Sequence, residues 1–146
     1  MMQIVERIHH NTEVDATLTL PFELRQRSRF STHLDSGEKV DLFLPRGSIL
    51  RHGDVLRADD GKVIVIHSAR EAVSTASADS PLILAKACYH LGNRHVALQI
   101  GTGWLRYLHD HVLDQLVRQL GLVVMNEMLP FEPEAGAYAH TAHHAL

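Results

Sequence analysis

The hydrophobic pattern of the chain changes near residue 70, and this change limits the folds open to it. Before this point, apolar and polar residues alternate in short runs, as in half-buried β-strands. After it, strand-like runs are separated by stretches in which apolar residues recur at helical spacing. The sequence therefore predicts two domains, residues 1–70 and 71–146, with a boundary near Arg70–Glu71.

The first half has the pattern of a small all-β domain. Two of its alternating pairs are joined by turn sequences, Asp35-Ser36-Gly37-Glu38 and Asp59-Asp60-Gly61, and are predicted to be hairpins. Expected strands lie at residues 3–8, 16–20, 30–34, 40–44, 55–57 and 63–66.

The second half predicts the order βαββαβ. Ser80 can cap a helix that has Pro81 at its first position, and Gly92 should end it. A second helix with one apolar stripe follows His109 and should end at Gly121. Expected strands lie at residues 72–78, 96–100, 104–108 and 122–128. This order is that of a ferredoxin-like domain, so the fold class is α+β, and the residues from about 135 should form a mobile tail.

Histidine is the unusual component of the composition. The chain has 12 histidines among 146 residues, and histidine is the commonest metal ligand in proteins. The single cysteine, Cys88, excludes a disulfide framework and a CxxC-type metal site within one chain. A net charge of −3 gives no basic footprint for nucleic acid. No apolar run is long enough for a membrane helix or a signal peptide, so we expect a soluble, cytoplasmic protein.

The tripeptide His109-Asp110-His111 is the first candidate metal site. Extended backbone would place both imidazoles on one face, whereas a continuous helix would turn them apart. The pair can therefore share a metal only if the helix begins after His109. The alternative is that both are exposed polar residues at a helix start, with Asp110 favoured by the helix dipole.

Four further histidines are candidates under stricter conditions. His95 alone cannot hold a divalent ion firmly, so a ligand role requires a second copy of the chain related by a two-fold axis. Otherwise it is an ordinary hydrogen-bonded residue. A short histidine-rich tail can bind metal without a fold, or simply aid solubility. The tail histidines are His140, His143 and His144.

Other features carry less information about function. Arg25, Arg27 and Arg29 alternate, which predicts either a solvated strand face or a docking surface for an acidic partner. None of the common nucleotide-binding, zinc-protease or serine-hydrolase motifs occurs.

Three longer blocks resemble the signatures of a known family. They are residues 84–96, 106–113 and 129–138, and Leu44-Pro45-Arg46-Gly47 and Gly53-Asp54-Val55-Leu56 fit the same family. This family is that of the urease accessory metallochaperones, which deliver nickel. The resemblance covers nearly the whole chain.

The resemblance implies a fold, a cargo and partners. The family has an N-terminal β domain that binds a protein partner, and a ferredoxin-like metal domain that forms a homodimer with a metal site at its interface. His95 corresponds to the interfacial histidine, and His109 and His111 to a further pair. Many members end in a long histidine tract, which His140, His143 and His144 match only in part. The implied cargo is Ni(II), and the implied partners are urease apoprotein and its accessory proteins, including an accessory GTPase.

Imidazole ligands also suit Cu(II) and Zn(II), which are expected to compete with nickel. The leading hypothesis is thus a nickel carrier that is not an enzyme. One alternative is a metal-dependent hydrolase that uses His109-Asp110-His111, although the barrel enzymes with such a motif need about 250 residues. Another is a metal-independent binding module; an RNA-binding role would need more aromatic residues on the sheet than Trp104 and Tyr107.

Overall fold

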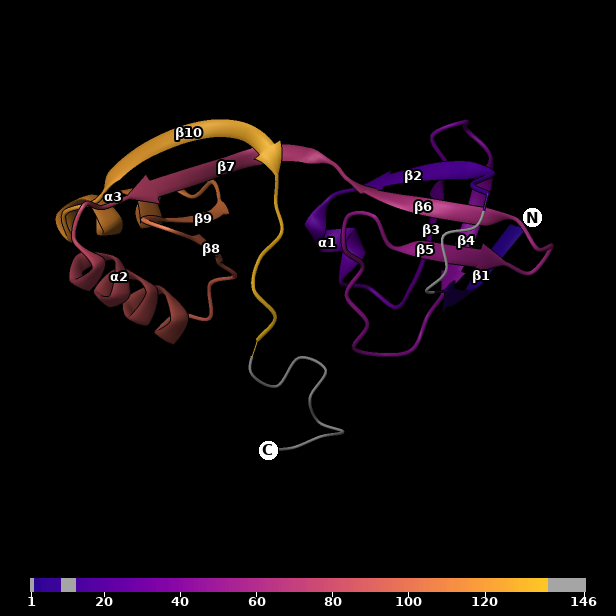
Figure 1. Ribbon diagram of the computed structural model, residues 1–146, viewed down its shortest axis with the longest axis horizontal. Helices are drawn as coiled ribbons and strands as arrows, with labels where there is room; N and C mark the ends of the chain where they lie inside the picture. Colours follow the sequence, from indigo (N-terminus) through magenta and orange to yellow (C-terminus); the bar gives the residue numbers. More distant parts are fainter. Residues whose placement is uncertain (1, 9–12, 137–146) are drawn as a thin grey trace. The chain divides into compact units, whose positions relative to one another are not determined.

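The computed structural model describes residues 2–8 and 13–136. They form two compact units, the first ending at Ala69 and the second extending from Arg70 to Gly136 (Figure 1). Within the described residues, no helix is long and apolar enough to cross a membrane.

The first unit is a β-sheet with one short helix. Along the chain its elements are β1 (Met2–Ile8), β2 (Ala16–Leu20), α1 (Phe22–Arg25), β3 (Arg29–His33), β4 (Lys39–Phe43), β5 (Val55–Ala58) and β6 (Val63–Ser68). The strands lie in the order β2-β6-β5-β1-β4-β3. Both expected hairpins, β3–β4 and β5–β6, are antiparallel. The β-rich character predicted for this half is confirmed.

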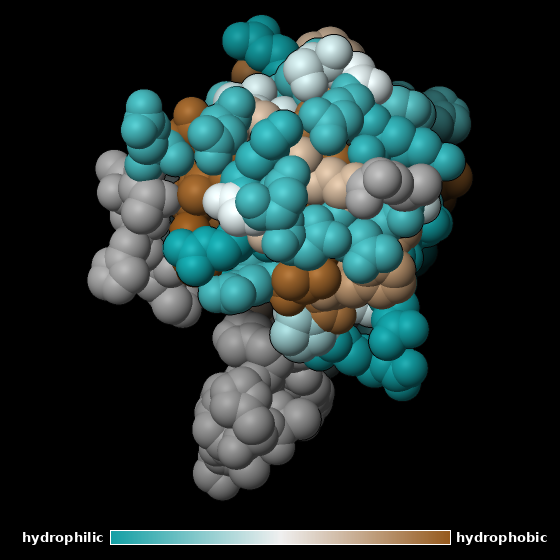
Figure 2. Space-filling view, turned by 90° about the vertical axis from the view of Figure 1, so that its right-hand side faces the viewer, coloured by the Kyte–Doolittle hydropathy of each residue, from teal (hydrophilic) through white to brown (hydrophobic). Residues whose placement is uncertain are grey.

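Alternation along these strands builds the core of the first unit. In β4, Val40 and Leu42 are fully buried while Lys39 and Phe43 are exposed. Ile4, Leu18, Leu56 and Ile64 extend the same cluster from other strands. The face of the molecule in Figure 2 is accordingly mostly hydrophilic, with small apolar patches.

The second unit has the predicted element order. Along the chain it contains β7 (Arg70–Ser77), α2 (Pro81–Asn93), β8 (Gln99–Gly101), β9 (Trp104–Leu108), α3 (His111–Gln119) and β10 (Val123–Pro130). The strands lie in the order β10-β7-β9-β8, with every neighbouring pair antiparallel. Numbered within the unit, this is the 4-1-3-2 order of a ferredoxin-like sheet, so the α+β prediction is confirmed.

Both helices pack on one face of this sheet. Strand pairing sets Ala76 beside Leu105 and Val124, and Ser74 beside Tyr107, on the same face. Ala87 and Leu91 of α2 and Val117 of α3 belong to the cluster that covers this face. Ser80 caps α2 as expected, because its side chain accepts a hydrogen bond from the Ile83 amide.

Two local expectations are wrong. Residues 96–98 were expected to belong to a strand, but β8 begins only at Gln99. The segment before β8 instead takes part in the turn that ends helix α2, where the Val96 amide donates to the Leu91 carbonyl. The expectation that Arg25, Arg27 and Arg29 alternate on one strand also fails, since Arg25 belongs to α1 and is buried.

Candidate metal and partner-binding sites

His95 lies directly after helix α2 in an unusual backbone conformation. Its φ is 59°, and no other described non-glycine residue has a positive φ. The His95 amide donates to the Gly92 carbonyl (3.0 Å), and the Val96 amide donates to the Leu91 carbonyl (3.2 Å). These two bonds form a Schellman motif, whose left-handed position is usually a glycine. Here a histidine takes that position, exposed to solvent.

The expectation that Gly92 ends the helix is therefore wrong. Gly92 lies inside α2, which continues to Asn93, and Gly92 is not among the glycines with positive φ. The helix ends where the carbonyls of Leu91 and Gly92 accept hydrogen bonds from amides beyond Arg94. His95, like a glycine in this motif, turns the chain toward β8.

Helix α3 begins at His111, one residue beyond the His109-Asp110 pair. Asp110 is its N-cap, and the Asp110 carboxylate accepts hydrogen bonds from the amides of Val112 (2.8 Å) and Leu113 (3.1 Å). His109 thus precedes the helix, which meets the condition for a shared site with His111. His111 is exposed at the first helical position.

The His109 ring contacts a polar network under the helix. Its Nδ1 lies 3.1 Å from Ser74 Oγ, 3.3 Å from Asn126 Nδ2 and 3.4 Å from Asp114 Oδ2. Tyr107 donates to Asp114 Oδ1 at 2.6 Å. The His109 side chain is 43% exposed, so one edge of the ring is held while part of it meets solvent.

Two acidic groups of this network have shifted pKa values. Burial favours the neutral form of Asp114, but hydrogen bonds from Tyr107, Ser74 and Asn126 stabilise the carboxylate and hold its pKa below its ordinary value. Burial and the nearby Asp114 carboxylate raise the pKa of Tyr107. Tyr107 therefore remains a neutral donor to an ionised Asp114 at neutral pH.

The residues of this network were not identified from the sequence. Ser74 on β7, Asn126 on β10 and Tyr107 on β9 become neighbours through strand register, which local patterns do not encode. One usable signal was available: Asp114 is three residues before Val117, so it lies on the apolar stripe of the second helix. A charged residue there predicts a buried polar partner.

The candidate ligands do not converge into a closed metal site. Across residues 2–8 and 13–136, no group of three or more histidine, cysteine, aspartate or glutamate side chains is arranged to hold a metal ion. A hydrolytic zinc centre typically needs three protein ligands, so the hydrolase alternative gains no support. His140, His143 and His144 lie outside the described residues.

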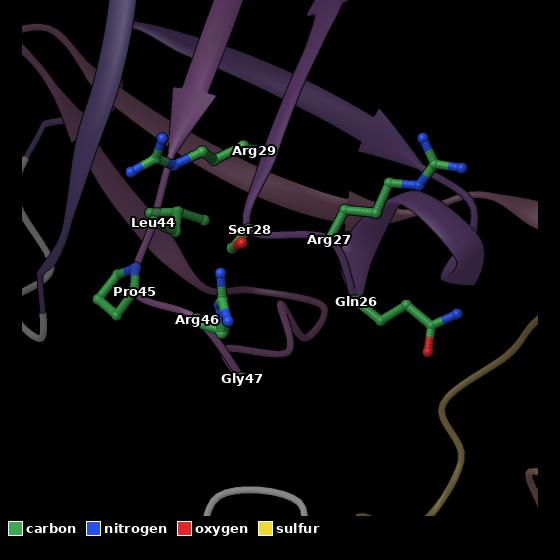
Figure 3. Close-up of a pocket in the computed structure, with 8 residues that line it drawn as sticks. All are labelled: Gln26, Arg27, Ser28, Arg29, Leu44, Pro45, Arg46 and Gly47. Carbon is green, nitrogen blue, oxygen red and sulfur yellow. The ribbon is translucent and has the colours of Figure 1, made fainter.

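A basic cleft opens beside the ends of β3 and β4 in the first unit (Figure 3). Its volume is about 630 Å³, and none of its lining residues is acidic. Arg27 pairs with Glu23 at 2.7 Å, and Arg29 lies over the ring of Phe43. In Figure 3 the Arg46 side chain points toward Ser28, while Arg27 extends away from both. The lining residues are Gln26, Arg27, Ser28, Arg29, Leu44, Pro45, Arg46 and Gly47.

Arg25 has a structural role in place of the docking role considered for it. Its guanidinium is fully buried and donates to the carbonyls of Leu20 (3.1 Å) and Leu50 (3.2 Å). These bonds connect α1 to the end of β2 and to the segment between β4 and β5. The exposed positive charge at this end of the sheet is carried by Arg27, Arg29 and Arg46.

Comparison with known proteins matches both units to one family. Residues 2–69 match the N-terminal domain, and residues 71–146 the C-terminal domain, of the UreE urease accessory protein. A urease accessory protein UreE of Alkalilimnicola ehrlichii is 59% identical over 138 residues, covering 94% of this chain and 85% of the relative. Those of Citrobacter koseri and Enterobacter sp. are 53% and 51% identical, each covering 98% of this chain and 95% of the relative. The chain therefore belongs to the UreE family of urease accessory proteins.

Proposed function

We propose that the chain is a carrier of Ni(II) for the assembly of the urease active site, and that two copies hold one ion between their His95 side chains. The observation that carries this proposal is the left-handed backbone of His95. Backbone strain in a non-glycine residue persists where the side chain is needed. The His95 ring is exposed and, within the part of the chain that the structure describes, has no hydrogen-bond partner. It is available to an ion.

A two-fold dimer would complete the site. One imidazole supplies a single ligand, and a two-fold axis through the metal supplies a second, equivalent one, which leaves further coordination positions for other ligands. Helix α2, which ends at Asn93 shortly before His95, also exposes two large apolar side chains, Leu82 and Tyr89. They are seven residues apart and so lie on one helix face. This face suits burial against a second copy of the chain.

Weaker binding is proposed for the remaining candidate ligands. His109 and His111 flank the N-cap of α3, and both are exposed. The tail histidines His140, His143 and His144 are proposed to add further ligands, or to complete the interfacial site. Residues 71–146 would thus serve metal binding and dimerisation.

Release of the metal follows from the openness of such a site. A shared site with few protein ligands permits an incoming partner to exchange ligands, whereas a closed four-ligand cage would not. The ligands must be neutral, so affinity should fall as the pH drops through the histidine range. Cu(II) and Zn(II) would compete for the same imidazoles. No bond of a substrate is broken in this scheme, which describes a cytoplasmic carrier and not an enzyme.

The partners proposed for the carrier are urease apoprotein and its accessory proteins, including the accessory GTPase. Residues 1–70 are proposed to dock a partner, and the basic cleft of Arg29 and Arg46 suits an acidic segment. Replacing Arg46 with glutamate should then weaken partner binding and its salt dependence. Lys39→Glu, at the other end of the β3–β4 hairpin, is the matched control and should change neither.

The proposal is tested by calorimetric titration of nickel with the mass of the same sample determined. We expect a dimer with one tight nickel ion per two chains, together with weaker sites. A His95→Ala variant should remain dimeric and lose the tight site, and a tight site unchanged in that variant would refute the assignment. Replacing His109, His111 and the tail histidines should lower the total stoichiometry only.

A further inference from the structure

The second unit contains a polar cluster between helix α3 and the sheet. Ser74 and Tyr107 are fully buried, and Asp114 is 3% exposed. Strand register places Ser74 between Tyr107 and Asn126 on the sheet face that the helices cover. Helix α3 then brings Asp114 over this row. Burying a polar group costs free energy unless it is fully hydrogen-bonded, so each buried group of the cluster should have a donor or an acceptor beside it.

Two donors of the cluster can be assigned from the groups that they face. A carboxylate only accepts hydrogen bonds, so Tyr107 donates to Asp114 Oδ1 at 2.6 Å. The two amide hydrogens of Asn126 have their closest acceptors in Ser74 Oγ at 2.9 Å and Asp114 Oδ2 at 3.2 Å. They are then not available to His109 Nδ1, which lies 3.3 Å from Asn126 Nδ2.

The groups that face His109 Nδ1 favour a hydrogen on that nitrogen. Asp114 Oδ2 lies 3.4 Å from Nδ1 and, as a carboxylate oxygen, can only accept. Ser74 Oγ, 3.1 Å away, already receives an Asn126 hydrogen and has a second lone pair for Nδ1–H. A hydrogen on Nδ1 thus has two acceptors within reach, whereas a bare lone pair there would face the Asp114 carboxylate. In a neutral imidazole, a hydrogen on Nδ1 leaves the lone pair on Nε2, at the opposite edge of a ring that is partly exposed.

We propose that Ser74, Asp114 and Asn126 are positioning residues that hold His109 as the Nδ1–H tautomer and present its Nε2 to a divalent metal ion. Metal-binding histidines commonly donate their other ring N–H to a nearby acceptor such as a carboxylate. This bond fixes the tautomer and the orientation of the ring and increases the basicity of the ligating nitrogen. The device lies within one chain and so operates without the dimer interface. It rests on the proposed function only in that His109 is a ligand; its tautomer assignment stands without metal.

A purely structural role for the cluster makes different predictions. If the cluster only attaches α3 to the sheet, removal of any of its hydrogen bonds should lower stability and leave the His109 tautomer unchanged. Tyr107→Phe is the matched control, because it deletes a hydrogen bond to Asp114 but none to His109. Asp114→Asn and Ser74→Ala instead alter the acceptors that face His109 Nδ1.

The test combines tautomer and affinity measurements on the full chain in a His95→Ala background. Long-range ¹H–¹⁵N NMR of the metal-free protein should give the Nδ1–H form of His109 in the parent and in Tyr107→Phe, and a mixture of tautomers in Asp114→Asn. Zn(II) should bind His109 through Nε2 in the parent, about 10- to 100-fold more weakly in Asp114→Asn, and within about twofold of the parent in Tyr107→Phe. Ser74→Ala should act in the direction of Asp114→Asn and serves if that variant does not fold.

Several results would overturn the inference. An Nε2–H tautomer in the parent contradicts the proposed protonation of Nδ1. Equal zinc affinity in the parent, Asp114→Asn and Ser74→Ala leaves the cluster with a structural role alone. Zinc that causes no shift at His109 removes its ligand role. None of these outcomes touches the tight site assigned to His95, whose failure would be seen in the nickel titration of the unmodified dimer.

Discussion

His95 has a backbone conformation that a glycine would adopt at lower cost. Left-handed φ values cost a residue with a Cβ atom about 1–2 kcal/mol. The chain contains a glycine three residues earlier, and that glycine is used inside the helix instead. The histidine at this position is therefore a feature that folding alone does not favour. The proposed metal-binding role of its side chain gives a reason for its presence, and substitutions at this position can separate the effect of the imidazole from that of the backbone strain.

Replacing His95 with glycine should make the metal-free protein more stable while it loses the tight nickel site. We expect the free energy of unfolding to rise by about 1 kcal/mol relative to the unmodified chain, because the strain at φ 59° is relieved. His95→Ala removes the same imidazole and keeps the strain, so it is the control. Urea unfolding at a fixed protein concentration, followed by fluorescence of the single tryptophan, Trp104, measures both. Equal stability of the two variants would show that the backbone is not strained.

Strands and helices of this chain could be predicted from local pattern, but their contacts could not. Alternation gave the β3–β4 hairpin, and Ser80-Pro81 gave the start of α2. The end of α2 was predicted at Gly92 because glycine commonly ends a helix. The helix instead ends in a Schellman motif in which His95 takes the left-handed position, and its bonds to Leu91 and Gly92 are seen only in the fold. The His109 cluster depends on the register of separate strands, which only the folded sheet establishes.

Asp35 illustrates such a contact between elements. It lies between β3 and β4, yet its carboxylate accepts hydrogen bonds from Thr17 Oγ1 (2.7 Å), Thr19 Oγ1 (2.8 Å) and the Thr19 amide (3.0 Å). The two threonines belong to β2, an edge strand of the sheet. Partial burial would raise the pKa of Asp35, but these bonds to the ionised form outweigh it and lower the pKa. The carboxylate thus connects β2 to the β3–β4 hairpin more strongly when it is ionised, in addition to the bond from the Asp35 amide to the Thr17 carbonyl.

Asp35→Asn should loosen β2 at neutral pH and have less effect in acid. A group whose pKa is lowered by folding stabilises the fold above its unfolded pKa, near 3.9, and loses this contribution as the pH falls through the folded value. We expect amide hydrogen exchange at Thr19 to be about fivefold faster in the variant at pH 7, equivalent to about 1 kcal/mol for a solvent-screened site. The difference should shrink toward pH 3. Asp60→Asn, in the β5–β6 turn, is the control; a pH-independent difference for Asp35→Asn would contradict this account.

At the scale of the whole molecule, the proposed function depends on how many chains share one ion. A carrier must hold nickel against dilution and still release it to the next protein. In the proposed site, two His95 rings from two chains would meet both needs, because the ion would be bound only while the dimer is intact and its remaining coordination positions would stay open to an incoming ligand. The His109 cluster lies within one chain, so the two kinds of site should respond differently when the dimer is disrupted.

Tyr89→Asp should separate them. Tyr89 is 65% exposed on the same face of α2 as Leu82, and a carboxylate placed there would have to be desolvated in the proposed interface between two copies. We expect a monomer at micromolar concentration by light scattering, loss of the tight nickel site in calorimetry and retention of the weaker binding at His109. Val123→Asp on β10 places the same charge at an equally exposed apolar position and should leave the dimer and its tight site intact. A dimeric Tyr89→Asp with unchanged tight binding, or a monomeric Val123→Asp, would place the interface elsewhere and remove the geometric basis for sharing nickel through His95.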